Sequence, residues 1–188
     1  MPTLLFDRDS TGIILLNGQR IEDIKPVILC GSIGNIPADS KLKAKSKPND
    51  LIVRIGGKTN PIGIGGGAAS SMDAGTNNAE LDYKSVQRAE PMVENLTYQV
   101  IQHCVFLGSE NPIDDLTDQG AGGISTALTE LSSPEGALVD VRKLNVSDKS
   151  MSYSDIWIAE SQEHSILKIK KEKLEKFNLN IEVLSETT

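Results

Sequence analysis

The sequence predicts an α/β or α+β fold built from layers of strands and helices. Short apolar runs bounded by turn residues, such as residues 50–55, are typical of buried strands. Longer segments repeat apolar residues every three or four positions, as after Pro91, and are typical of amphipathic helices. Because the two kinds of segment intermingle along the chain with short connections, the sequence indicates a layered structure that contains both.

Length, composition and charge narrow the class of protein. With 188 residues the chain can bury a core, and since aromatic residues make up only 4%, that core must consist mainly of aliphatic side chains. The net charge of −7 argues against a nucleic-acid-binding surface, which needs a basic footprint. The apolar run 13–16 is too short to span a bilayer. We therefore expect a soluble, cytoplasmic protein with no nucleic-acid or membrane partner.

The two cysteines and two histidines suggest no reactive centre. Cys30 and Cys104 stand far apart and form no metal-binding or redox motif, so each is expected to be a small buried apolar residue. His103 and His164 are interpreted as ordinary helix and strand residues rather than catalytic bases.

Residues 1–24 are interpreted as a lead-in to a domain of residues 25–188. Strand-like runs at 3–6 and 12–16 flank residues of turn composition, so a hairpin is the simplest prediction.

The elements of the main domain follow from apolar runs and apolar periodicity. Strands are predicted at residues 26–30, 50–55, 112–116, 137–141, 165–169 and 180–184. Helical segments are predicted from Pro91 to Gly108, from the glycines before Ile124, at 154–157 and at 170–178. Loops are predicted at 31–37 and 63–71, a solvated lysine-rich surface at 38–50, and an irregular polar segment at 72–90. The apolar faces of the two longer helices consist of Val93, Leu96, Val100, Cys104 and Leu107, and of Ile124, Ala127, Leu128 and Leu131.

The first of two glycine-rich runs, residues 63–71, reads Gly-Ile-Gly-Gly-Gly-Ala-Ala-Ser-Ser. It follows a predicted strand, an arrangement that can present backbone N–H groups to a phosphate. The candidate phosphate contacts are Gly65, Gly66, Gly67, Ser70 and Ser71, and the two serines are also interpreted as structural caps.

The second run, residues 118–125, reads Asp-Gln-Gly-Ala-Gly-Gly-Ile-Ser. A carboxylate before glycines and a helix suits a metal or phosphate site at the helix start. Asp is also a favoured helix N-cap, so spacing alone supports metal binding and capping by Asp118 about equally. Taken together, the two runs favour an anionic ligand.

Four separated motifs carry a resemblance to a known family. They read GIGGGAASS at 63–71, LDYKSVQR at 81–88, DQGAGGIS at 118–125 and IWIAESQE at 156–163, and a further segment reads CGSIGNI at 30–36. Their order and spacing resemble phosphoribosylformylglycinamidine synthase (formylglycinamide ribonucleotide amidotransferase) in its long single-chain form. The resemblance covers roughly residues 25–184 and is to the C-terminal half of the first aminoimidazole-ribonucleotide-synthetase-like unit. It implies a mixed β-sheet packed with helices.

The resemblance implies an ATP-dependent ligase of purine biosynthesis that converts formylglycinamide ribonucleotide and glutamine to formylglycinamidine ribonucleotide. Asp118 would bind Mg²⁺, which prefers oxygen ligands. The substrate contacts would be Gln87, Glu160, Ser161 and Gln162. In the family, the ATP-binding loops and a catalytic histidine come from the preceding half-unit, and ammonia comes from a separate glutaminase domain. No catalytic residue is therefore assigned, and the chain alone is expected to be inactive.

Other interpretations stay open. Without the resemblance, Gln87 is a surface residue, and Glu160 and Gln162 share one face of a solvent-facing strand edge. A related enzyme of the thiamine-monophosphate kinase or selenophosphate synthetase type is an alternative function. A non-catalytic assembly module, pairing as a homo-oligomer through an exposed apolar surface, is another.

Overall fold

The computed structural model describes residues 4–10, 13–22, 27–38, 42–73, 75–85, 90–161 and 163–178. The chain divides into two compact units, the first formed by residues 1–43 with 73–76 and the second by residues 44–72 with 77–188. The lead-in predicted over residues 1–24 falls within the first unit.

The first unit contains two antiparallel strand pairs. Strand β1 (Leu4–Ser10) pairs with β4 (Val27–Ile33), and β2 (Ile13–Leu16) pairs with β3 (Gln19–Glu22). The chain reverses at Asn17 and Gly18, whose φ values of 52° and 79° suit a tight two-residue hairpin.

The predicted hairpin between residues 3–6 and 12–16 is therefore wrong. The polar residues 7–10 continue β1 instead of turning, and the reversal lies at the Asn-Gly pair, the strongest short-range hairpin signal. The loop expected over 31–37 also begins later, because β4 runs on to Ile33.

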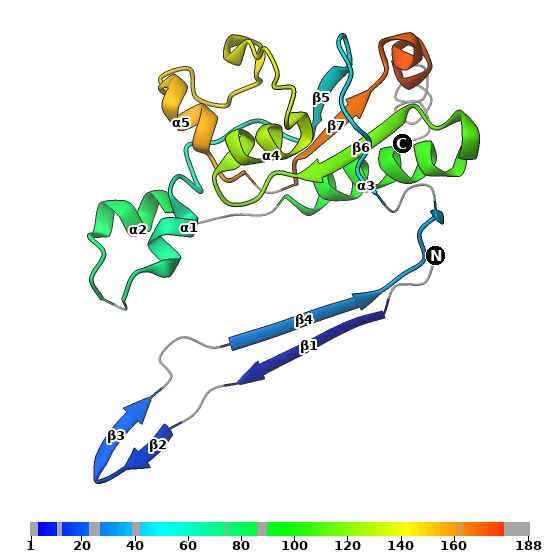
Figure 1. The fold of residues 1–188 in the computed structure, drawn as a ribbon. Helices are drawn as coiled ribbons and strands as arrows, with labels where there is room; N and C mark the ends of the chain where they lie inside the picture. Colours follow the sequence, from blue (N-terminus) through cyan, green and yellow to red (C-terminus); the bar gives the residue numbers. More distant parts are fainter. Residues whose placement is uncertain are drawn as a thin grey trace. The chain divides into compact units, whose positions relative to one another are not determined.

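The second unit is built on a three-stranded sheet with the order β5-β7-β6 (Figure 1). Strands β5 (Leu51–Ile55) and β6 (Ile113–Asp118) both run antiparallel to the central strand β7 (Ser165–Ile169). Beyond the sheet, Thr59 and Val146 form a parallel bridge. The strands predicted at 50–55, 112–116 and 165–169 are confirmed.

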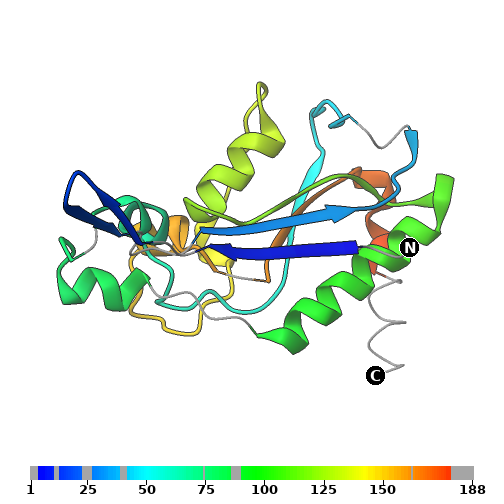
Figure 2. The same ribbon diagram turned by 90° about the horizontal axis from the view of Figure 1, so that it is seen from below.

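Helices cover both faces of this sheet, as Figures 1 and 2 show. Leu167 and Ile169 of β7 are fully buried and pack with Cys104 of helix α3 (Pro91–Phe106). Ile166, which points to the opposite face, packs against helix α4 (Gly123–Ser132). Burial of each such side chain contributes about 1.5–3 kcal/mol, so the central strand anchors both apolar clusters.

The predicted face of α4 is confirmed, because Ile124, Ala127, Leu128 and Leu131 are all buried. On α3 the prediction holds for Cys104 and for Val100, which packs against the core, whereas Leu96 is 40% exposed. Ile101, which was not predicted to face inward, also packs against the core. The packed face of α3 is therefore rotated toward Ile101, and Leu96 lies at the edge of that face.

Two segments predicted to be loops contain helices. The second half of the glycine-rich run forms α1 (Gly66–Ser71), and the polar segment contains α2 (Ala79–Ser85), with Glu80 and Asp82 in its first turn. Acidic residues near a helix N-terminus stabilise it, which helps a polar sequence to form α2.

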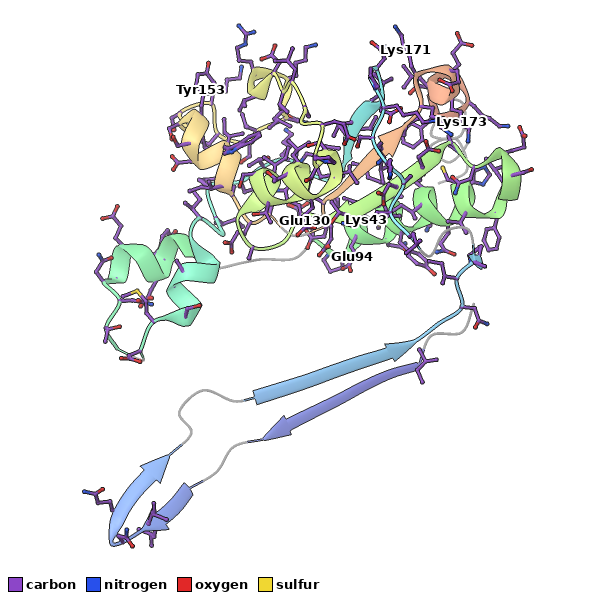
Figure 3. All side chains as sticks on the ribbon, viewed as in Figure 1. Lys43, Glu94, Glu130, Tyr153, Lys171 and Lys173 are labelled. Atoms are coloured by element: carbon purple, nitrogen blue, oxygen red, sulfur yellow. The ribbon has the colours of Figure 1, made fainter. Side chains whose placement is uncertain are left out.

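The strand predicted at 137–141 is wrong. Val139 packs against the α4 cluster, whereas Leu138 is fully exposed, so the apolar run supplies one anchor rather than a paired strand. Helix α5 (Tyr153–Ile158) confirms the predicted helical turn, and Figure 3 shows Tyr153 at its start. The strand predicted at 180–184 lies outside the described residues.

The charged helix predicted at 170–178 is present in part. A 3-10 turn, Lys171–Lys173, comes first, and helical residues 174–178 follow it. Figure 3 shows Lys171 and Lys173 on this turn after β7. Among the helices of the described residues, none is long and apolar enough to cross a membrane.

Lys168 is a buried cation on the central strand. Its side chain is 1% exposed, and Nζ lies 3.6 Å from Oδ2 of Asp115 on β6. Nζ also donates to the carbonyl oxygen of Ala44 and, at 3.3 Å, to Oγ of Ser46. Ser46 Oγ in turn donates to the Leu131 carbonyl at the end of α4. Lys168 therefore fixes the segment before β5 to the sheet and to α4.

Replacing Lys168 by Met is expected to lower the free energy of unfolding by about 3 kcal/mol, because it leaves the Asp115 carboxylate buried without its cation. Urea denaturation checks this. Lys170→Met is the matched control, since Lys170 pairs with Asp114 at 3.3 Å but is 34% exposed. That variant should lose less than about 1 kcal/mol. Equal losses in the two variants would show that burial of Lys168 adds nothing.

Candidate functional site

The two glycine-rich runs meet at one buried carboxylate. Glu160 is 4% exposed. Its Oε2 and Oε1 accept a hydrogen bond from the N–H of Gly67 at 3.0 and 3.2 Å. Oε1 also accepts from the N–H of Gly122 at 3.1 Å. One acidic side chain thus holds together two loops that are distant in sequence.

The backbone around Glu160 is packed so closely that positions 63 and 123 must be glycine. The N–H of Glu160 donates to the carbonyl of Gly63 at 2.9 Å, beside an antiparallel bridge between Ile64 and Ala159. A Cβ at Gly63 would lie 2.7 Å from the Glu160 carbonyl oxygen, and a Cβ at Gly123 would lie 2.6 Å from that of Ala159. Both glycines also have a positive φ. Contacts within the chain therefore account for these two glycines without a ligand.

The candidate phosphate contacts lie at the start of α1. Gly65 is the residue before the helix, with φ 71°, and Gly66 and Gly67 form its first turn. The N–H of Gly67 is taken up by Glu160. Ser71 Oγ donates to the Gly67 carbonyl at 2.9 Å, in keeping with the structural interpretation of this serine. The side chain of Ser70 lies outside the described residues, and phosphate binding stays a prediction.

Asp118 is the last residue of β6, and its side chain is exposed. The capping interpretation is wrong, because Gly122 occupies the N-cap of α4, with no side-chain hydrogen bond. The described residues contain no group of three or more His, Cys, Asp or Glu suited to a metal. A single accessible carboxylate nevertheless fits Mg²⁺, which keeps several waters and takes one or two protein carboxylates together with substrate phosphate.

Ser161 follows Glu160 and is 6% exposed. Its Oγ is buried and has no hydrogen-bond partner among the described residues. Because a buried hydroxyl without a partner is costly, Oγ is suited to accept or donate a bond to a bound molecule. Gln87 and Gln162 lie outside the described residues, so their predicted substrate contacts stay predictions.

Two residues without a predicted role, Gln119 and Arg54, connect these parts. Gln119, which is 5% exposed, donates through Nε2 to the Ala159 carbonyl at 2.9 Å, and its backbone N–H donates to the His164 carbonyl at 3.0 Å. Arg54 of β5 donates through Nε to Gln119 Oε1 at 3.2 Å and through Nη2 to Thr59 Oγ1 at 2.9 Å. Asp118 and Glu160 are each one residue from the bond between Gln119 and Ala159.

The environment of Arg54 is unusual for a guanidinium. Burial lowers the pKa of Arg54 to about 10. Within the described part of the chain its partners are neutral oxygens, those of Gln119 and Thr59. No role was predicted from the sequence for this arginine, which lies inside the apolar strand run 51–55.

His164 and Cys104 are buried residues with structural roles. His164 is 5% exposed, with Nε2 at 2.7 Å from the Gly57 carbonyl and Nδ1 at 3.3 Å from that of Ser161. Cys104 is fully buried, and burial raises the pKa of its thiol, as expected for an apolar core residue. The side chain of Cys30 lies outside the described residues.

Comparison with known proteins places this arrangement in a family. Residues 47–179 match the AIR synthase related protein family, C-terminal domain. The chain belongs to this family. As a C-terminal domain of the AIR synthase type, it has the fold class that the sequence predicted.

Two curated relatives are similar over nearly the whole chain. One is the probable phosphoribosylformylglycinamidine synthase, chloroplastic/mitochondrial, of Arabidopsis thaliana, 41% identical over 87% of this chain and 12% of the relative. The other is the phosphoribosylformylglycinamidine synthase of Homo sapiens, 41% identical over 90% of this chain and 13% of the relative. The chain thus spans about an eighth of the length of these relatives.

Solved structures from Thermotoga maritima share the fold. PurL complexed with FGAR matches with a TM-score of 0.69 and 26% identity, covering 85% of this chain and 26% of that chain. PurLQS matches with a TM-score of 0.60 and 22% identity, covering 82% and 23%. The predicted likeness to the C-terminal domain of an aminoimidazole-ribonucleotide-synthetase-like unit is confirmed.

Gly123→Ala is expected to destabilise the domain by about 3 kcal/mol, through a positive φ and a clash with the backbone of residues 158–159. Thermal and urea denaturation measure the effect. Gly120→Ala, in the same loop, is the control: its Cβ would meet nothing closer than Asp118 Oδ2 at 3.9 Å, so the change should stay within about 0.5 kcal/mol. A stable Gly123→Ala protein would contradict the close packing of α4 on residues 158–159.

Proposed function

We propose that this chain is a domain of phosphoribosylformylglycinamidine synthase, the ATP-dependent ligase that makes formylglycinamidine ribonucleotide in purine biosynthesis. The observation that carries the proposal is 41% identity, over nearly the whole chain, to two relatives of that name. The fold shared with Thermotoga maritima PurL complexed with FGAR supports it. The same names favour this function over the thiamine-monophosphate kinase and selenophosphate synthetase alternatives.

In this proposal the chain supplies one wall of the site, formed by Asp118, Ser161 and the loops bonded to Glu160. Ser161 Oγ, buried and without a partner among the described residues, binds formylglycinamide ribonucleotide. Glu160 stays a proposed substrate contact and also orders the wall, because its carboxylate already accepts from Gly67 and Gly122. Gln87 and Gln162 contribute further substrate contacts.

Asp118 is the proposed magnesium ligand. Its exposed carboxylate at the end of β6 offers oxygen to the ion without first breaking an internal cap. Bound there, Mg²⁺ would neutralise charge on the phosphate groups. Asp118 would hold the ion; the next residue, Gln119, is hydrogen-bonded to Ala159, the neighbour of Glu160.

ATP is the proposed co-substrate. The Thermotoga maritima PurL protein has also been solved in complex with ATP. The proposed partners are the preceding half-unit and a glutaminase domain of the same enzyme. Cytoplasmic location, pairing of two copies as a homo-oligomer, and the alternative role as an assembly module stay predictions.

Calorimetry with formylglycinamide ribonucleotide and Mg²⁺ tests the site directly. The wild-type chain is expected to bind the ribonucleotide more tightly when Mg²⁺ is present. In Asp118→Asn this Mg²⁺-dependent gain should fall by about tenfold, because the neutral amide loses a charged oxygen ligand.

Asp114→Asn is the matched control, since it removes an acid from the same strand where the carboxylate pairs with Lys170. Its affinity should equal that of the wild type. If the Mg²⁺-dependent gain in affinity is as large in Asp118→Asn as in the wild type, Asp118 is not a magnesium ligand. If the wild-type chain binds no ribonucleotide, that result counts against the proposed function.

The purified 188-residue chain is expected to show no turnover with ATP, glutamine and formylglycinamide ribonucleotide, because positioning of ATP against the substrate is assigned to the preceding half-unit. Coupled detection of ADP release measures this, with an intact enzyme of the family as the positive control. Sustained ADP release that depends on the ribonucleotide would show that this chain holds the ATP site itself.

A further inference from the structure

Both polar atoms of the Gln119 side-chain amide form hydrogen bonds. Nε2 donates to the Ala159 carbonyl at 2.9 Å, and Oε1 accepts from Arg54 Nε at 3.2 Å. Arg54 offers only donors and the Ala159 carbonyl only an acceptor, so a flipped amide would oppose like groups at both contacts. Arg54 thereby fixes the orientation of the amide, and with it the donor that faces Ala159.

The Ala159 carbonyl lies in a tightly packed place. Ala159 is fully buried, and the backbone of Gly123 approaches so closely that a Cβ there would lie 2.6 Å from this oxygen. Little room is left for water to replace the amide, so an apolar residue at position 119 would leave the carbonyl unsatisfied.

We propose that Gln119, oriented by Arg54, is a positioning residue that holds residues 159–161 in place, and through them the Glu160 carboxylate and the Ser161 hydroxyl. Loss of the donor to Ala159 frees the segment on which Glu160 engages the N–H groups of Gly67 and Gly122. The effect on the loops follows from the contacts described above. The effect on ribonucleotide binding rests on the proposed function.

The test is Gln119→Met, which keeps the length of the side chain and removes both hydrogen bonds. Native-state amide exchange, followed by NMR, should speed up about tenfold at Gly67 and Gly122. Exchange at Ile166 and Leu167, in the central strand, should change only as much as global stability does. Calorimetry should show ribonucleotide affinity about tenfold weaker than in the wild type.

Thr117→Val is the matched control. Thr117 is a buried polar residue of β6, the strand that ends just before Gln119; it is 8% exposed, and its Oγ1 donates to Glu130 Oε2 at 3.4 Å. This variant lowers global stability without touching Ala159. Its exchange at Gly67 and Gly122, corrected for global stability, and its ribonucleotide affinity should equal those of the wild type.

Gln119→Glu is the second variant, in case Gln119→Met fails to fold. It keeps an acceptor for Arg54 and lacks the donor to Ala159, so the same local rise in exchange is expected. The deciding quantity is the amide exchange rate at Gly67 and Gly122 in whichever Gln119 variant folds. If that rate, corrected for global stability, equals the rate in the Thr117→Val protein, the inference is wrong. If the wild-type chain binds no ribonucleotide, the proposed function fails, while the exchange measurement still decides the role of Gln119.

Discussion

The hydrogen bonds from Gly67 and Gly122 to the Glu160 carboxylate are the interaction on which the candidate site depends. A carboxylate that is 4% exposed carries a large desolvation cost unless donors surround it. Backbone N–H groups supply those donors here, and no side-chain rotamer has to be ordered to present them. The acid therefore stabilises the loops, and the loops make burial of the acid tolerable.

This interaction changes the interpretation of the glycines. A glycine-rich run is compatible with two physical causes, close approach of a ligand and close approach of the chain to itself. At Gly63 and Gly123 the second cause is sufficient, because a Cβ would overlap the backbone of residues 158–160. Contacts within the chain therefore set the shape of these loops, and the exposed residues of the second run are Asp118, Gly120 and Ala121.

Sequence patterns predicted the elements whose burial is regular. Strands β5 and β7 are short apolar runs and the face of α4 has a clear helical period, and the structure confirms all three. The patterns were wrong where an apolar run does not pair, as at 137–141, and where the turn signal at Asn17 and Gly18 was outweighed by polar residues earlier in the chain. Propensity cannot tell a polar strand from a turn until the partner strand is known.

For the site, the resemblance pointed to Glu160 and to both glycine runs, which the structure brings together. It gave no role to Arg54 or Gln119, because their contact joins residues 65 positions apart in sequence and depends on the register of the sheet. No local pattern encodes such a pair. An arginine in an apolar strand and a glutamine before glycines are each unremarkable until the fold places them in contact.

The two faces of the three-stranded sheet differ in the side chains that they carry. On the α3 face the core around Leu167 and Ile169 is apolar, so it contributes burial but little positional information. On the α4 face Arg54 lies opposite Ile166, and Lys168 lies opposite Ile52, so each strand presents one apolar and one charged residue there. Each cation secures a segment from elsewhere in the chain: the buried Lys168 secures the stretch before β5, and the half-buried Arg54 secures the loop that carries Gln119. Because a buried cation tolerates few arrangements of oxygen around it, these contacts restrict where each segment can lie, which apolar packing alone does not do. The precision of the wall around Glu160 therefore originates on the α4 face of the sheet.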